Sequence, residues 1–209
     1  MKNKEIQVPM VVVKRLPRYY RYLDDLLKNN VYRISSAELS KKMNVTASQI
    51  RQDFNYFGGF GQQGFGYSVQ MLHAEIGEIL GLNKGIKTIL VGAGNLGKAL
   101  ANHSKFEKRG FHMIGAFDVD PEIVGKKIKD ITIKDYSEME EFVKENSPDI
   151  AILTVSQKNV KEVVKHLEDI GIKAIWNFSY TEFESDKLIV ENVHLSDSIM
   201  MLSYKLHNE

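Results

Sequence analysis

The stretch Thr88-Ile89-Leu90-Val91-Gly92-Ala93-Gly94-Asn95-Leu96-Gly97 decides the fold class of this chain of 209 residues. It joins four residues typical of a buried strand to a G-x-G-x-x-G motif that opens a helical pattern. In such a motif Gly92 permits a tight turn, Gly94 lets the backbone approach a pyrophosphate, and Gly97 lets helix and strand pack closely. The free N–H groups at the start of the helix favour an anion. The stretch therefore predicts a dinucleotide-binding unit, with residues 92–97 as candidate cofactor contacts.

The chain after Gly85 has an α/β pattern. Strand-like runs alternate with helical patterns, with strands expected at 88–91, 113–117, 150–155 and 174–178 and helices at 96–108, 137–146 and 160–170. Such alternation predicts a parallel sheet with right-handed crossovers. Asp118 lies 21 residues after Gly97, where a carboxylate would accept hydrogen bonds from an adenosine ribose and repel a 2′-phosphate. The pattern favours NAD(H) over NADP(H).

Two other functions for this unit stay open. A small NAD-dependent oxidoreductase would need a proton donor and substrate anchors, but the sequence has no Tyr-x-x-x-Lys pair, and too little chain follows the unit for a substrate domain. A coenzyme A module is also Rossmann-like, although Asp118 should disfavour its 3′-phosphate. The sequence thus favours a ligand sensor over an enzyme.

The N-terminal part predicts a winged helix. Helical spacing over 16–29 is followed by a capping box at Ser35 and Glu38 and a second at Thr46 and Gln49. Two short capped helices joined by a turn of a few residues are typical of helix-turn-helix. Glycine then alternates with aromatic residues over 58–67, which predicts a β-hairpin with its tip near Gln62-Gln63. A further short helix is expected at 73–80.

In a winged helix the second capped helix enters the major groove, and the hairpin reaches the minor groove or phosphates. Arg51 suits guanine or phosphate, whereas Gln52 and Asn55 suit adenine. The candidate DNA contacts are Lys41, Lys42, Thr46, Ser48, Gln49, Arg51, Gln52, Asn55, Tyr56, Gln62 and Gln63. A winged helix used for protein contact is the alternative.

Composition agrees with two units that have different partners. Residues 1–84 carry 12 Lys and Arg against 7 Asp and Glu, whereas residues 85–209 carry 16 against 20. The absence of cysteine excludes disulfides and thiolate zinc sites. No apolar run approaches the roughly 18 residues of a membrane span, and the charged N-terminus has no apolar signal core. We therefore expect a cytoplasmic protein without a membrane partner.

These motifs follow the order found in the Rex family, the redox-sensing transcriptional repressors of bacteria, which the chain resembles over nearly its whole length. The matching stretches are Lys14-Arg15-Leu16-Pro17-Arg18-Tyr19-Tyr20, Gln49-Ile50-Arg51-Gln52-Asp53-Phe54, Tyr56-Phe57-Gly58, 61–67, 92–97, Phe117-Asp118-Val119-Asp120-Pro121, Leu153-Thr154-Val155 and Asn177-Phe178.

The resemblance implies a homodimer that represses fermentation and respiration genes at an A·T-rich palindrome, is released by NADH, and binds NAD⁺ as a weaker competitor. It implies a winged helix over 1–84, a Rossmann domain over 85–195, and a C-terminal helix over 196–209 that exchanges between subunits. Further residues take implied roles: Thr154, Val155, Asn177, Phe178 and His103 in cofactor binding, and Arg21 in coupling the domains.

Three positions depart from the family pattern. Gln62-Gln63 stand where relatives often have Lys-Arg, which should weaken phosphate contacts. His103 stands where members often have a Tyr that takes part in the redox switch. His194 stands where some members have an acidic residue.

Overall fold

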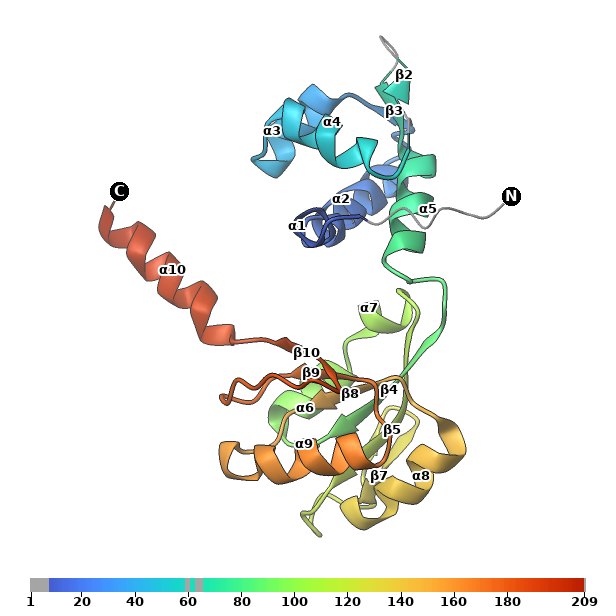
Figure 1. The fold of residues 1–209 in the computed structure, drawn as a ribbon, viewed down its shortest axis with the longest axis vertical. Helices are drawn as coiled ribbons and strands as arrows, with labels where there is room; N and C mark the ends of the chain where they lie inside the picture. The colour runs from blue at the N-terminus through green and yellow to red at the C-terminus, as the bar shows by residue number, and fades with distance from the viewer. Residues whose placement is uncertain (1–7, 59–60, 63–65, 209) are drawn as a thin grey trace. The chain divides into compact units, whose positions relative to one another are not determined.

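The computed structural model describes residues 8–58, 61–62 and 66–208, which form two compact units divided between Asn83 and Lys84 (Figure 1). The first is a winged helix and the second a Rossmann-like domain, so the predicted fold class is confirmed. The winged-helix unit comprises the described residues up to Asn83, and the Rossmann unit comprises those from Lys84 onward.

The winged-helix unit combines short helices with a small antiparallel sheet. Its elements are α1 (Met10–Val13), α2 (Leu16–Lys28), β1 (Arg33–Ile34), α3 (Ser36–Met43), α4 (Ala47–Asn55), β2 (Gly61–Gln62), β3 (Gly66–Ser68) and α5 (Val69–Ile79). The sheet order is β1-β3-β2, with both pairs antiparallel. The predicted hairpin is therefore present as β2 and β3, while its tip residue Gln63 lies outside the described residues.

The two capped helices form the helix-turn-helix, but their caps differ. At α3, Ser35 Oγ accepts from Glu38 N and the Glu38 carboxylate accepts from Ser35 N, so this capping box is complete. The left-handed Asn44 then ends the helix. At α4, Thr46 Oγ1 accepts from Gln49 N at 3.1 Å, but the Gln49 side chain donates to Asp53 instead of returning to Thr46. The prediction of a second full capping box is wrong, because a buried carboxylate takes the Gln49 amide.

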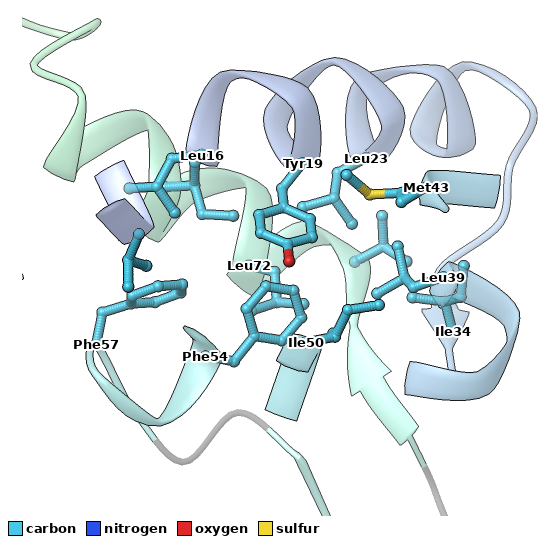
Figure 2. Close-up of a cluster of buried hydrophobic side chains, with 13 residues drawn as sticks. Leu16, Tyr19, Leu23, Ile34, Leu39, Met43, Ile50, Phe54, Phe57 and Leu72 are labelled. Atoms are coloured by element: carbon cyan, nitrogen blue, oxygen red, sulfur yellow. The ribbon is translucent and has the colours of Figure 1, made fainter. Parts of the chain in front are cut away.

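The core of this unit gathers apolar side chains from helices α1 to α5 and from β1 (Figure 2). Leu16, Tyr19 and Leu23 of α2 face Ile50 and Phe54 of α4, and the Tyr19 and Phe54 rings meet edge to face at 5.1 Å. Leu39 and Met43 of α3 and Leu72 of α5 also belong to it, as do Val12 of α1 and Ile34 of β1. These contacts pack α4 against α2 and thereby fix which side of α4 is exposed to solvent.

Helix α5 begins at Val69, four residues before the expected start, because Ser68 caps it by accepting from Met71 N. The earlier start places His73 within the helix, where its ring stacks on Tyr20 of α2 at 4.1 Å. Asp24 lies 3.9 Å from His73 Nε2.

We expect the winged-helix unit to lose stability as pH falls below neutrality. Burial lowers the pKa of His73, although Asp24 opposes this effect. Because the folded-state pKa of His73 is depressed, the unfolded chain takes up the proton first as pH falls. The contribution of His73 to the free energy of unfolding is therefore fully present above the ordinary imidazole pKa of about 6.5. This contribution is lost as pH falls through the folded-state pKa. The melting temperature should therefore be lower at about pH 5 than at about pH 7.5. The substitution His73→Phe keeps the stack on Tyr20 and should reduce that difference, and an unchanged difference in the variant would contradict this role.

The Rossmann unit is a seven-stranded sheet of order β10-β9-β8-β4-β5-β7-β6 (Figure 1). The strands are β4 (Ile86–Val91), β5 (Phe111–Asp118), β6 (Lys127–Ile128), β7 (Ile131–Asp135), β8 (Ile150–Leu153), β9 (Ala174–Asn177) and β10 (Ile189–Asn192). All neighbouring pairs are parallel except β6 with β7. The strand order places β4, which carries the glycine motif, beside both β5 and β8.

Helices cover the two faces of this sheet unequally. The helices are α6 (Asn95–Ala101), α7 (Ser104–Glu107), α8 (Met139–Asn146), α9 (Val160–Asp169) and α10 (Leu195–Asn208). One face packs on Met139 and Val143 of α8 and on Val163 and Leu167 of α9. The other face packs on Ala101 of α6. The second face is thus the less covered one.

The predicted single helix at 96–108 is broken into α6 and α7. The Asn102 side chain donates to Lys98 O at 2.9 Å, and His103 leaves the helix with φ −75° and ψ 98°. The break lets Phe106 of α7 reach the sheet, where its ring lies 5.4 Å from that of Trp176. Packing on the sheet therefore outweighs the local helical pattern.

Helix α10 ends the described chain as an amphipathic helix. None of its residues is buried within the described part of the chain. Within residues 8–58, 61–62 and 66–208, no helix is both long and apolar enough to cross a membrane.

Candidate functional site

The glycine motif forms a turn that the neighbouring strands hold in place. Gly92 has φ +94°, donates from its N–H to Phe117 O at 2.9 Å, and accepts from Thr154 Oγ1 at 2.6 Å. A Cβ at Gly92 would lie 2.9 Å from the Thr154 backbone, and a Cβ at Gly97 would overlap Gly92 O. Gly92 and Gly97 are therefore needed for the turn and for the contact between strand and helix.

Gly94 differs from these two glycines. It is the N-cap residue of α6, is exposed, and has no described heavy atom within 4 Å of the position that a Cβ would take. The exposed Asn95 and Leu96 follow it, and no side chain of the described residues caps the helix start. Uncapped N–H groups at a helix start attract an anion. The space above Gly94 is therefore available to a phosphate group.

Asp118 lies at the edge of this glycine turn. Its Oδ2 accepts from Ala93 N at 2.5 Å and its Oδ1 accepts from Asp120 N at 3.0 Å. The half-buried carboxylate thus comes from the carboxyl end of β5 and bonds directly to the motif on β4. It can order the turn as well as present an oxygen to a bound ribose.

The other candidate cofactor residues occupy three different settings. Thr154 supports the turn through its bond to Gly92 O, and the half-buried Val155 follows it. Asn177 is buried, donates to Thr181 O and Asn192 Oδ1, and accepts from Ser179. Its amide thus shapes the loop after β9.

Phe178 and His103 lie among aromatic side chains. The Phe178 ring meets Trp176 at 4.6 Å. His103 lies beyond the end of α6 that is opposite the glycine turn, with its ring 4.8 Å from Phe106. The structure therefore brings Asp118 and Thr154 to the turn but does not bring His103 there.

An apolar cavity of about 550 Å³ lies on the less covered face of the sheet. Leu100, Phe106, Met113, Ile152 and Trp176 line it, and Ile189 of β10 borders it. Its strand residues come largely from the amino-terminal halves of the strands, away from the glycine turn. No pattern in the sequence indicates this cavity, because the helix expected over 96–108 would cover it, whereas the observed helix α6 ends at Ala101.

The outer side of α4 carries most candidate DNA contacts. Ser48, Arg51, Gln52 and Asn55 of α4 are exposed, as is Tyr56 at its C-cap. The Arg51 guanidinium donates to Ser36 Oγ at 3.1 Å. Residues at both ends of the turn are exposed as well, namely Lys41, Lys42 and Thr46. Gln62 lies in β2, and Arg21 is exposed on α2. The predicted contacts on α4 thus share a surface, with one exception.

The exception is Gln49, which takes part in a buried ionic cluster that the sequence analysis missed. Asp53 is fully buried on α4 and accepts from Arg15 Nη2 at 2.6 Å, Arg15 Nε at 2.8 Å, Tyr19 Oη at 2.8 Å and Gln49 Nε2 at 2.9 Å. Burial raises the pKa of Asp53, but these hydrogen bonds outweigh it and hold the pKa below its ordinary value. A charged residue between Ile50 and Phe54 on the apolar side of a helix was the available signal.

Known proteins resemble the chain along almost all of its length. Residues 83–181 match the CoA binding domain model, and residues 7–55 match the model of a putative DNA-binding protein N-terminus. A redox-sensing transcriptional repressor Rex of Caldicellulosiruptor saccharolyticus is 54% identical, over 99% of this chain and 94% of that protein. The chain belongs to the Rex family.

Solved structures of a Rex-family repressor, RSP, agree with this membership. RSP in complex with β-NAD⁺ and operator DNA is 53% identical, with a TM-score of 0.90 over 96% of this chain and 93% of that one. RSP in complex with β-NADH is 50% identical, with a TM-score of 0.90 over 97% of this chain and 95% of that one. The Rex fold therefore accounts for both units of this chain.

Proposed function

We propose that the chain is a transcriptional repressor that senses the NADH/NAD⁺ ratio, binding operator DNA as a homodimer and leaving it when NADH binds. The observation that carries this proposal is the presence in one chain of two sites. One is an exposed polar surface on α4, and the other is a glycine turn with Asp118 bonded to its backbone. The complexes of RSP with operator DNA, NAD⁺ and NADH support both partners.

In this function the operator is an A·T-rich palindrome, because Gln52 and Asn55 suit adenine. A symmetric dimer needs half-sites separated by roughly one helical turn or a multiple of it. If NADH lowers operator affinity, operator must lower NADH affinity by the same factor.

Arg21 is the residue proposed to couple the two units, and His103 is a proposed contact of the nicotinamide part of the cofactor. The site of action is the cytoplasm, where such an operator lies.

The chain acts as a binding protein and not as an enzyme, since its relatives are named as repressors. Coenzyme A is the competing ligand, because residues 83–181 match the CoA binding domain model. The position of Asp118 argues against it, since a carboxylate beside the adenosine ribose repels the extra phosphate of coenzyme A as it would that of NADP(H).

Asp118→Ala is expected to weaken NADH binding and to narrow the preference for NADH over NADPH. The substitution removes the ribose acceptor, the repulsion of a 2′-phosphate and the bond to Ala93 N. Isothermal titration with NADH, NADPH and coenzyme A measures all three affinities. Asp118→Asn is the matched control, because it keeps an acceptor oxygen without the charge. An unchanged NADH affinity in Asp118→Ala would remove Asp118 from the cofactor site.

The homodimer is proposed to form through residues 196–209, with α10 of one copy entering the apolar cavity of the other. Leu195, Ile199, Leu202 and Leu206 recur at helical spacing and are each more than half exposed. An exposed apolar stripe of this kind is typical of a protein interface. The cavity beside Trp176 offers apolar walls of matching character.

Leu202→Glu combined with Leu206→Glu is expected to convert the dimer to a monomer, because two buried carboxylates without partners oppose association. Sedimentation velocity measures the mass. Asn208→Glu adds a charge on the other side of α10 and should leave the dimer intact. A dimeric double variant would show that another surface holds the two copies together.

One experiment tests the proposed function as a whole. The full chain selects its operator from a randomised duplex library, and the selected duplex is then titrated with protein in the presence of NADH, NAD⁺ or coenzyme A. We expect NADH to release the duplex at a lower concentration than NAD⁺, and coenzyme A to have no effect. Equal release by NADH and NAD⁺ would rule out redox sensing.

A further inference from the structure

We propose that Arg15, Tyr19, Gln49 and Asp53 form a positioning network that sets the rotation of α4 about its own axis, and that Gln49 serves this network instead of reading a base. The proposal rests on the proposed DNA-binding function and assigns a role within the same helix. It divides the polar residues of α4 into those that face DNA and those that hold the helix.

The positioning network joins three parts of the winged-helix unit through one carboxylate. Arg15 lies at the junction of α1 and α2, Tyr19 lies on α2, and Gln49 and Asp53 lie on α4. Each Asp53 carboxylate oxygen accepts two hydrogen bonds. Oδ1 accepts from Arg15 Nη2 and Gln49 Nε2, and Oδ2 accepts from Arg15 Nε and Tyr19 Oη. The Asp53 side chain has no exposed surface, and that of Arg15 is 28% exposed. Four donors from fixed directions therefore define where Asp53 can lie.

Directional bonds matter here because the surrounding contacts are apolar. Ile50 and Phe54 are buried on the inner side of α4, and hydrophobic contact has no preferred direction. Such a surface tolerates small rotations of a helix, whereas a bidentate Arg–carboxylate pair adds geometric specificity. The network therefore supplies the angular precision that the core alone lacks.

The helical geometry places the candidate base contacts directly opposite Asp53. At about 100° per residue, Arg51 and Asn55 lie roughly 160° and 200° around the helix from Asp53. Gln49 lies only about 40° from Asp53, on the inner side. A rotation of α4 that displaces Asp53 must therefore displace Arg51 and Asn55 through the same angle, while Gln49 cannot face the groove together with them.

The network also changes the role of Arg15. An arginine in the basic winged-helix unit would ordinarily be assigned to DNA phosphate. Here its Nε and Nη2 both bond to Asp53, and the two charges compensate each other. Arg15 thus contributes little to the attraction for DNA and acts through the position of α4.

The first test separates positioning from base reading at Gln49. The selected operator duplex and each of its single-base-pair variants are titrated with three proteins, namely wild type, Gln49→Ala and the control Gln70→Ala. Gln70 is an exposed residue on α5. The wild-type preference for the operator tests the proposed function separately. We expect Gln49→Ala to bind the operator about threefold to tenfold more weakly and to discriminate less at several base pairs together, because a displaced α4 moves Arg51 and Asn55 at once. Uniform weakening of every duplex would indicate a phosphate contact and would overturn the proposal. Loss of discrimination at one base pair alone would show that Gln49 reads that base and would overturn the proposal.

The second test removes the buried charges of the network, and the half-buried Gln49 is the one member that loses its partner. The triple variant Arg15→Met, Tyr19→Phe, Asp53→Leu replaces the polar cluster by apolar side chains, an exchange that often preserves stability. We expect it to melt within a few degrees of wild type, to bind a scrambled duplex within about threefold, and to lose at least about tenfold of its preference for the operator. A stable triple variant with wild-type preference would overturn the proposal. Gln49→Ala keeps the conclusion independent of how well the triple variant folds.

Discussion

Gly94→Ala is expected to leave the Rossmann unit folded and to weaken NADH binding by at least about tenfold, which corresponds to about 1.4 kcal/mol. Gly94 has φ −68°, a value that alanine adopts freely, and no described heavy atom lies within 4 Å of the added Cβ. The methyl group would instead occupy the space above the start of α6, where the backbone of such motifs approaches a pyrophosphate. The substitution thus removes room for the ligand without disturbing the protein.

Gly97→Ala serves as the contrasting variant. Its Cβ would overlap Gly92 O and lie 2.9 Å from Thr154 Oγ1, so the strand and helix must separate. We expect a lower melting temperature in Gly97→Ala and an unchanged one in Gly94→Ala, with NADH affinity measured by isothermal titration in both. Wild-type NADH affinity in Gly94→Ala would place the pyrophosphate away from this turn.

Local sequence rules predicted the elements that such rules control. The turn at Gly92 needs a positive φ, and the complete capping box at Ser35 needs a carboxylate three residues later, so each is visible in a short stretch. β10 is different, because Ile189–Asn192 is a short segment that becomes a strand only by pairing with β9. The hairpin of β6 and β7 was missed for the same reason, since it depends on the pairing of β7 with β5.

The candidate sites divide in the same way. Asp118 could be placed beside the glycine turn because the spacing of a βαβ unit sets that distance. The Asp53 cluster could not be placed, because its partners Arg15 and Tyr19 lie more than 30 residues away and their pairing is tertiary. Gln49 was therefore grouped with exposed neighbours by residue type, although the structure turns its amide inward.

Arg51→Ala is expected to abolish specific operator binding while leaving the dimer and NADH binding intact. Arg51 is exposed on the side of α4 opposite the buried Asp53, and its guanidinium extends as far as Ser36 Oγ. A good arginine–base pair is worth roughly 1–3 kcal/mol, and a symmetric dimer makes two of them. The expected loss of affinity is therefore roughly 30-fold at the low end and more than 10⁴-fold at the high end. Since Arg51 belongs to the winged-helix unit, the glycine turn keeps all of its contacts.

Comparison with Lys41→Ala distinguishes a base contact of Arg51 from a phosphate contact. Both substitutions remove one positive charge from an exposed position in the helix-turn-helix. A phosphate contact at Lys41 should weaken binding about equally for all sequences and lower the salt slope by about 1 per contact. Arg51→Ala should instead relax specificity at the base pair that Arg51 contacts, which titration of the single-base-pair variants at several salt concentrations measures. If the folded Arg51→Ala variant bound all duplexes uniformly more weakly, Arg51 would be a phosphate contact, and base reading on α4 would fall to Gln52 and Asn55.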